Sequence, residues 1–167
     1  MQHRVAFYPC CRLDIKRPLE LLRPYADDVV FCDIDGSLLP RWKRIVGTKT
    51  AAEPRPSFLI GDIREAISQV AVINVLFYRR DSSGEGGSGM FVLGDSFLSH
   101  VLRRIPVEGG LIITDGSNSR GSNFKRMIRP NGMRKHEWLF RRSSEQPYLE
   151  SDGLHLVTVA PGEAVEA

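Results

Sequence analysis

Short apolar runs alternate with stretches of helical periodicity along the first two thirds of the chain. Residues 5–8 are an apolar run that ends at Pro9, and residues 15–22 place leucines at helical spacing. A second apolar run, 29–32, ends in Asp33. This order predicts a β-turn-α-β unit with a carboxylate at the tip of its second strand. Ligands of open parallel sheets bind beyond the carboxyl ends of the strands, so an acid there is well placed to accept hydrogen bonds from a ribose.

The same alternation continues to about residue 114. Strands are expected at 56–62, 71–78 and 111–114, and helices over 63–70 and 91–105. Alternating elements with short connections favour a doubly wound, mainly parallel Rossmann-like sheet with helices on both faces.

The last part of the chain has a different pattern. Residues 133–141 and 154–160 are both strand-like, and no helical stretch separates them. Successive strands without a crossover helix indicate an antiparallel hairpin, here with a long polar connection. We therefore expect residues 1–167 to form a single α/β domain with a C-terminal antiparallel hairpin.

The composition of the chain mainly argues against certain classes of protein. Apolar residues are 42% and charged residues 26%, which are ordinary values for a globular protein, and an excess of three positive charges is too small to indicate nucleic-acid binding by itself. No apolar run approaches the ~20 residues of a membrane span, and no signal sequence is recognisable, so we expect a cytoplasmic protein without a membrane partner. Cys10, Cys11 and Cys32 lack the spacing of a disulfide framework or a metal site, so we expect reduced thiols and no metal.

Three short motifs accompany the predicted strands. They are Asp33 after the second strand, Gly61-Asp62-Ile63 at the end of the third, and the segment 107–113, which has a turn followed by two glycines before strand five. Their order resembles the class I S-adenosylmethionine-dependent methyltransferase fold over about residues 4–160. The resemblance implies a methyltransferase, or a methyltransferase-like descendant that binds a nucleoside-type ligand, with S-adenosylmethionine as cofactor and an unidentified methyl acceptor.

The resemblance also assigns roles to residues at the strand ends. It implies that the loop 8–14 lies under the methionine portion of the cofactor, that Asp33 binds the ribose hydroxyls, and that Asp62 with Ile63 contacts the adenine. The cofactor-binding residues implied in this way are Tyr8, Pro9, Cys10, Asp14, Asp33, Asp62 and Ile63, and those bordering the substrate are Tyr78, Arg79 and Arg80.

Several of these residues also have an ordinary structural interpretation. Asp14 is placed to serve as the N-cap or a first-turn acid of the helix expected over 15–22, and Asp62 is placed to cap the helix that follows it. Asp33 is also compatible with a solvated strand end. The adjacent Arg79 and Arg80 are compatible with a solvated boundary or with holding an anionic substrate.

The first loop departs from the family's pattern. That loop is normally glycine-rich because a missing Cβ lets the backbone approach the ligand closely, and the loop 8–14 contains no glycine. If the thiols of Cys10 and Cys11 point into the crevice, they would collide with the ribose and methionine portion; if they turn into the core, the crevice stays open. We expect a mobile loop, 82–89, beside a cleft lined by Tyr8, Pro9, Cys10, Asp33, Asp62 and Tyr78.

A competing motif lies in residues 30–38. An apolar strand followed by Asp33-Ile34-Asp35-Gly36 resembles the nucleophile motif of haloacid dehalogenase-like phosphatases. That resemblance implies Asp33 as nucleophile and Asp35 as proton shuttle, with magnesium offsetting the charge. Thr114 and Lys125 fit the hydroxyl and lysine that follow in that family, but the late pair of metal-binding acids has no convincing counterpart.

A third interpretation is a non-catalytic interaction protein that uses residues 120–142. This stretch has eight lysines and arginines against one acid, Glu137, with three aromatic residues interspersed. Such a composition suits phosphate backbones and base stacking, and it is also typical of a solvated edge strand. It allows a nucleic-acid partner without favouring one.

Overall fold

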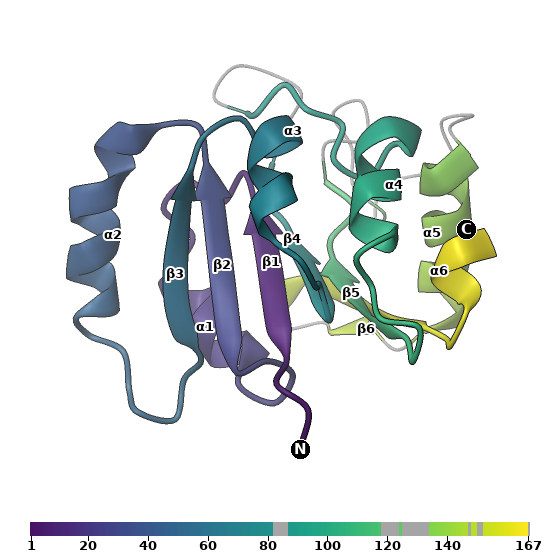
Figure 1. The fold of residues 1–167 in the computed structure, drawn as a ribbon, viewed down its shortest axis with the longest axis horizontal. Helices are drawn as coiled ribbons and strands as arrows, with labels where there is room; N and C mark the ends of the chain where they lie inside the picture. The colour runs from purple at the N-terminus through teal and green to yellow at the C-terminus, as the bar shows by residue number, and fades with distance from the viewer. Residues whose placement is uncertain (82–86, 118–123, 125–133, 147, 150–151, 167) are drawn as a thin grey trace.

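One seven-stranded sheet, in the order β3-β2-β1-β4-β5-β7-β6, forms the centre of the molecule (Figure 1). The computed structural model describes residues 1–81, 87–117, 124, 134–146, 148–149 and 152–166. All neighbours from β3 to β5 are parallel, and β7 is antiparallel to both β5 and β6. The strands are β1 (Val5–Pro9), β2 (Asp28–Asp33), β3 (Arg55–Ile60), β4 (Val75–Tyr78), β5 (Gly110–Thr114), β6 (Tyr148–Leu149) and β7 (Leu154–Val159).

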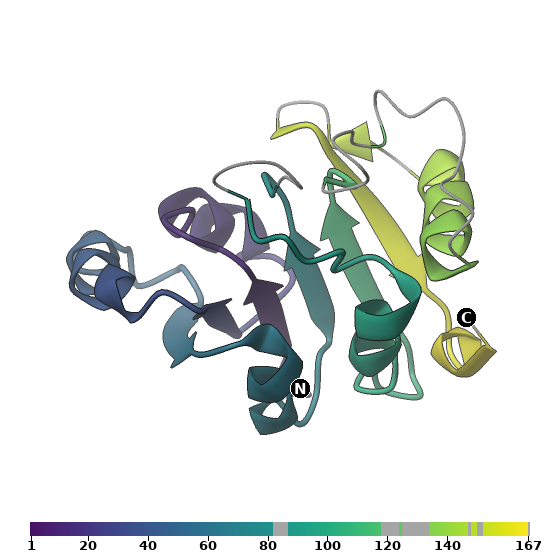
Figure 2. The same cartoon turned by 90° about the horizontal axis from the view of Figure 1, so that it is seen from above.

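Helices cover both faces of the sheet, as the alternating pattern predicts (Figures 1 and 2). On one face α1 and α2 pack with Ala6 and Tyr8 of β1, and on the other α3, α4 and α5 pack with Phe7. Successive side chains of a strand point to opposite faces, so one short apolar run supplies both layers of the core. The helices are α1 (Lys16–Leu22), η1 (Gly36–Leu38), α2 (Leu39–Val46), α3 (Ile63–Ala66), η2 (Ile67–Gln69), α4 (Asp95–Leu102), α5 (Arg134–Glu145) and α6 (Glu163–Glu166).

The antiparallel hairpin is confirmed, but its first strand is not the predicted one. Residues 133–141 were expected as a strand, and the structure places them largely in α5, whose buried residues His136, Leu139 and Ser143 recur at helical spacing. The short run Trp138-Leu139-Phe140 satisfies either period, so the pattern alone does not distinguish a strand from a helix. The hairpin partner of β7 is instead β6, a two-residue strand.

Two glycines explain how β5 enters the sheet. Gly109 has φ +99, and a Cβ there would lie 2.3 Å from the carbonyl oxygen of Val159. At Gly110 a Cβ would lie 2.7 Å from the carbonyl oxygen of Asn74. The glycine pair is therefore required by close backbone approach on both sides of β5. In the described part of the chain, no helix combines the length and apolarity needed to cross a membrane.

Candidate functional site

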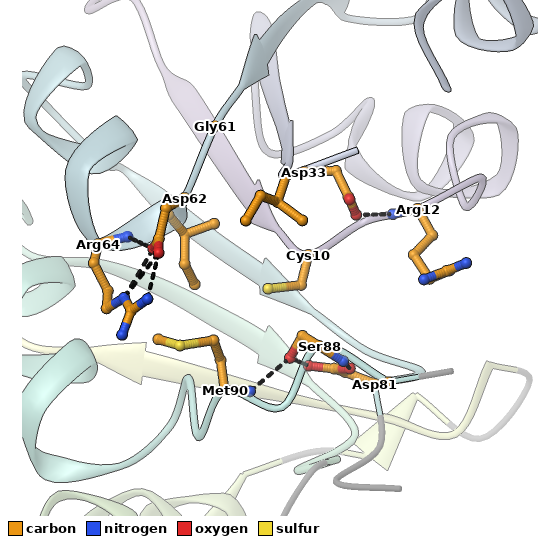
Figure 3. A pocket seen from close by; sticks show the side chains of 12 residues that line it. Cys10, Arg12, Asp33, Gly61, Asp62, Arg64, Asp81, Ser88 and Met90 are labelled. Carbon is orange, nitrogen blue, oxygen red and sulfur yellow. Dashed lines mark hydrogen bonds and ion pairs between the residues drawn. The ribbon is translucent and has the colours of Figure 1, made fainter. Parts of the chain in front are cut away.

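A cavity of about 180 Å³ lies at the carboxyl ends of β1, β2 and β3 (Figure 3). It includes residues predicted from three separate strand ends, because parallel strands bring their carboxyl ends to one edge. Segment 87–90 borders it on the β4 side. The lining residues are Cys10, Arg12, Asp33, Ile34, Gly61, Asp62, Ile63, Arg64, Asp81, Gly87, Ser88 and Met90.

Asp33 is a buried carboxylate held in place by the backbone. One oxygen accepts the Arg12 N–H at 3.0 Å and the other accepts the Asp35 N–H at 3.1 Å. Only 6% of the residue is exposed, so these two bonds offset much of the cost of burying its charge. A carboxylate has about four acceptor positions, and two therefore remain for a ligand.

Asp62 performs the capping role that the sequence offered as an alternative. Its side chain accepts the Arg64 N–H at 2.9 Å at the start of α3, and the Arg64 guanidinium folds back onto the same carboxylate. The hydrogen bond from the Arg64 side chain, with that from its backbone, lowers the pKa of Asp62 to about 2. Asp62 thus borders the cavity as an ionised group that already has a cation.

The side chains of Cys10 and Cys11 point in different directions. Cys10 lines the cavity, with its thiol directed toward the space between Asp62 and Met90 in Figure 3. Cys11 turns into the core on the face of α1 and α2. Burial raises the pKa of the Cys10 thiol to about 12, so the group facing the cavity is neutral.

The loop after β1 has glycine-like backbone geometry without glycine. Cys10 has φ 56 and Arg12 has φ 48, both in the left-handed region. Such angles cost a residue with a Cβ roughly 1–2 kcal/mol, and strained residues of this kind concentrate at functional sites. Trp42 helps to fix the loop by donating its indole N–H to the Arg12 carbonyl oxygen.

Asp81 is a site residue that the sequence analysis missed. Its carboxylate accepts the Tyr78 hydroxyl at 2.5 Å and the Ser88 N–H at 2.7 Å, and the Ser88 hydroxyl also contacts it. Like Asp33 and Asp62, it is an acid just beyond a strand, so the same signal was present in the sequence. Its bonds to Ser88 fix segment 87–90 at the border of the cavity.

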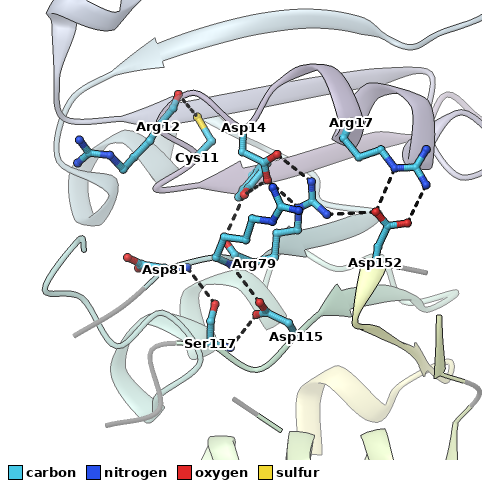
Figure 4. Close-up of polar contacts among 11 residues, drawn as sticks. Cys11, Arg12, Asp14, Arg17, Arg79, Asp81, Asp115, Ser117 and Asp152 are labelled. Atoms are coloured by element: carbon cyan, nitrogen blue, oxygen red, sulfur yellow. Dashed lines mark hydrogen bonds and ion pairs between the residues drawn. The ribbon is translucent and has the colours of Figure 1, made fainter. Parts of the chain in front are cut away.

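Asp14 and Arg79 form a separate network (Figure 4), which the Tyr8 hydroxyl joins. Arg79, whose side chain is fully buried, donates to both oxygens of Asp14 at 2.7 and 2.8 Å. The Tyr8 hydroxyl donates to Asp14 at 2.7 Å, and Asp152 contacts Arg79 at 3.5 Å and binds Arg17 at 2.8 Å. The capping role considered for Asp14 is wrong, because Ile15 is the N-cap of α1 and no side chain caps the helix.

The residues expected to bind cofactor are thus divided between two places. Cys10, Asp33, Asp62 and Ile63 meet at the cavity, whereas Tyr8 and Asp14 belong to the Arg79 network. Three further residues of the predicted site do not line the cavity: Pro9 and Tyr78 are buried and Arg80 is exposed.

The two aspartates of the phosphatase-like motif have different surroundings. Asp35 is exposed, and its carboxylate accepts the backbone N–H and the hydroxyl of Ser37 at the start of η1. It does not line the cavity beside Asp33. Among the residues that the structure describes, no three His, Cys, Asp or Glu side chains converge as metal ligands. Thr114 is buried, and Lys125 lies outside the described residues.

Two other predicted features fall partly outside the described residues. These are 82–86 of the loop 82–89, and 120–123 and 125–133 of the basic stretch. Within α5, Arg141 pairs with Glu137, and Arg142 pairs with Glu145 and Glu163.

No protein-family model matches the chain, and no curated protein matches its sequence. Solved structures do match in fold. Spermidine synthase from Thermotoga maritima aligns with a TM-score of 0.53 and 13% identity over 97% of this chain and 56% of its own. A spermidine synthase in complex with the transition-state analogue AdoDATO has a TM-score of 0.53 and 12% identity, and the alignment covers 97% of this chain and 56% of the synthase. TrmN from Thermus thermophilus has a TM-score of 0.50 and 19% identity, and the alignment covers 66% of this chain and 32% of TrmN.

At these identities the likeness concerns the fold alone. The chain has the class I methyltransferase-like fold that its sequence resembles, and spermidine synthases share it. The chain spans about a third to just over a half of the length of these structures.

Proposed function

We propose that this methyltransferase-like chain binds a nucleoside-type ligand in the cavity at the ends of β1, β2 and β3. The observation that carries the proposal is Asp33, a buried carboxylate at the cavity whose two backbone hydrogen bonds fix its orientation. Vicinal ribose hydroxyls are two adjacent donors, and they match the two acceptor positions that remain. Hydrogen bonds to an ionised group are the stronger kind, so Asp33 would supply both orientation and affinity.

The base would lie toward β3. Gly61 and Ile63 border the cavity there, and Ile34 is an apolar side chain that is 71% exposed beside it. Apolar walls with a few fixed polar groups are typical of small-molecule sites. The Asp62 carboxylate, occupied by Arg64, would serve more to shape this end than to bind the base.

S-adenosylmethionine would bring an activated methyl group, and its transfer depends chiefly on proximity and alignment with the acceptor. The residues present fit the nucleoside portion of that cofactor. The cavity, at about 180 Å³, is smaller than the roughly 300–1,000 Å³ of typical ligand sites, which favours a small ligand over the whole cofactor. Ligand binding is therefore the function supported best, and methyl transfer depends on a larger opening.

Isothermal titration calorimetry with adenosine, S-adenosylmethionine and S-adenosylhomocysteine tests the proposal. Asp33→Ala should weaken nucleoside binding roughly 10- to 150-fold. This change in affinity corresponds to the free energy of a hydrogen bond to a charged group. Asp35→Ala is the matched control, because Asp35 follows Asp33 closely and does not line the cavity.

The ribose contact has its own test. Replacing adenosine with 2′-deoxyadenosine should weaken binding to the unmodified protein and have little further effect in Asp33→Ala, because the two changes remove the same hydrogen bond. Absence of binding by every nucleoside at millimolar concentration would overturn the proposed function.

A further inference from the structure

We infer that the ligand of this cavity is a nucleoside without an amino-acid tail, because the chain itself fills the region into which such a tail would extend. The inference rests on the proposed function and narrows its ligand class. It follows from the direction of the ligand along the sheet edge, the position of Cys10, and the charges beyond it.

The direction is set by strand order. Asp62 and Ile63 follow β3, Asp33 ends β2, and Cys10 follows β1, and these strands are neighbours in that order. With the base at the β3 end and the ribose hydroxyls at Asp33, the 5′ carbon of the ribose points toward β1 and β4. A 5′ substituent must therefore pass the Cys10 side chain.

Cys10 cannot easily move aside. Its φ of 56 is strained, yet the adjoining loop is held by the Cys11 N–H donating to the Cys32 carbonyl oxygen at 3.2 Å and by the Arg12 N–H donating to Asp33. Strained residues persist where surrounding contacts over-determine them. A glycine in this conformation would leave open the part of the cavity between Asp62 and Met90 toward which the Cys10 thiol is directed.

The charges beyond Cys10 also disfavour an α-carboxylate. Asp81 is the acid on this side of the cavity; its carboxylate accepts hydrogen bonds from Tyr78 and Ser88 and offers no donor to a second carboxylate. Of the two cations that line the cavity, Arg64 is bound by Asp62 at the opposite end. The other, Arg12, directs its guanidinium away from Cys10 and Asp62 in Figure 3.

Among the described residues, the fully buried cation at the β4 end is Arg79, and it already has a partner. Arg79 binds Asp14 through two hydrogen bonds, and this pair joins the loop after β1 to the end of β4. The switch point between β1 and β4 is where ligands of such sheets bind, and the chain's own Asp14 carboxylate occupies the buried cation at that point. Figure 4 shows the pair and its link to Asp152.

The experiment compares three ligands with tails of increasing size: adenosine, 5′-methylthioadenosine and S-adenosylhomocysteine. Calorimetry on the unmodified protein should give the tightest binding for adenosine and at least tenfold weaker binding for S-adenosylhomocysteine. Cys10→Gly should reduce that ratio at least fivefold. Cys11→Ala is the control, because it removes the neighbouring thiol, which faces the opposite core, and it should leave the ratio unchanged.

The outcomes separate the two proposals. If the unmodified protein binds S-adenosylhomocysteine as tightly as adenosine, the inference is overturned and the proposed function stands. An unchanged ratio in folded Cys10→Gly, checked by circular dichroism, also overturns it. If no ligand binds to any variant, the proposed function fails and the inference fails with it.

Discussion

Asp14→Asn removes one charge from the buried Asp14–Arg79 ion pair while keeping an oxygen that accepts the Tyr8 hydroxyl. The Arg79 side chain is 0% exposed and that of Asp14 is 16% exposed, so the remaining guanidinium has no access to solvent. Removing one partner of a buried pair costs about 3–5 kcal/mol, because the other charge is left uncompensated. Asp152, 3.5 Å from Arg79, compensates in part, so we expect the lower end, about 3 kcal/mol.

Urea unfolding followed by circular dichroism measures this change. A loss of about 3 kcal/mol is a large part of the 5–15 kcal/mol that stabilises a typical domain, and it lowers Tm by roughly 6–12 °C. The double variant Asp14→Asn with Arg79→Met should recover much of the loss, because an apolar side chain of similar length removes the unpaired charge. Asp27→Asn, which affects an exposed pair with Arg4, is the control and should change little. A cost below about 1 kcal/mol for Asp14→Asn, or a double variant less stable than the single one, would refute the reasoning.

Three further predictions follow from individual residues. Because burial raises the pKa of Cys10 to about 12, alkylation of the folded protein by iodoacetamide should be slow at pH 7.5 and still accelerate above pH 9; fast labelling of Cys10 at pH 7.5 would contradict this. The folded pKa of Asp62, about 2, lies below its ordinary value of 3.8, so its stabilising effect is present above pH 4 and disappears as the pH falls toward 2. The Tm difference between the unmodified protein and Asp62→Ala should shrink over that range, and a constant difference would count against the cap. Gly109→Ala should destabilise the protein by about 1–3 kcal/mol in urea unfolding, since its Cβ would meet the Val159 carbonyl oxygen at φ +99; unchanged stability would show that β5 can shift.

Much of the fold could be predicted from local pattern. The continuous apolar run of β1 and the helical spacing of α1 are local properties, and their repetition predicted a parallel sheet with both faces covered. The positions of Asp33 and Asp62 at one edge followed from the same order, because parallel strands end on the same side. The strand predicted for residues 133–141 was wrong, because a three-residue apolar run fits the period of a strand and that of a helix. Packing against α4 and β7 stabilises the helical conformation of α5.

The division of the site was not predictable in this way. Asp14 and Arg79 are 65 residues apart in the sequence, and either residue had a plausible local role without the other. Only the adjacency of β1 and β4 brings the two side chains together, and burial then makes the ion pair obligatory because an isolated charge there is costly.

The sequence by itself thus determined the order of elements, the sheet edge at which Asp33 and Asp62 lie, and the absence of glycine in the first loop. The tertiary structure decided what that absence means. Cys10 takes a left-handed backbone conformation and directs its thiol into the cavity, while Cys11 is buried in the opposite core. Two adjacent identical residues have the same local preferences, so their opposite directions arise from the contacts that the folded loop makes with β2 and α2.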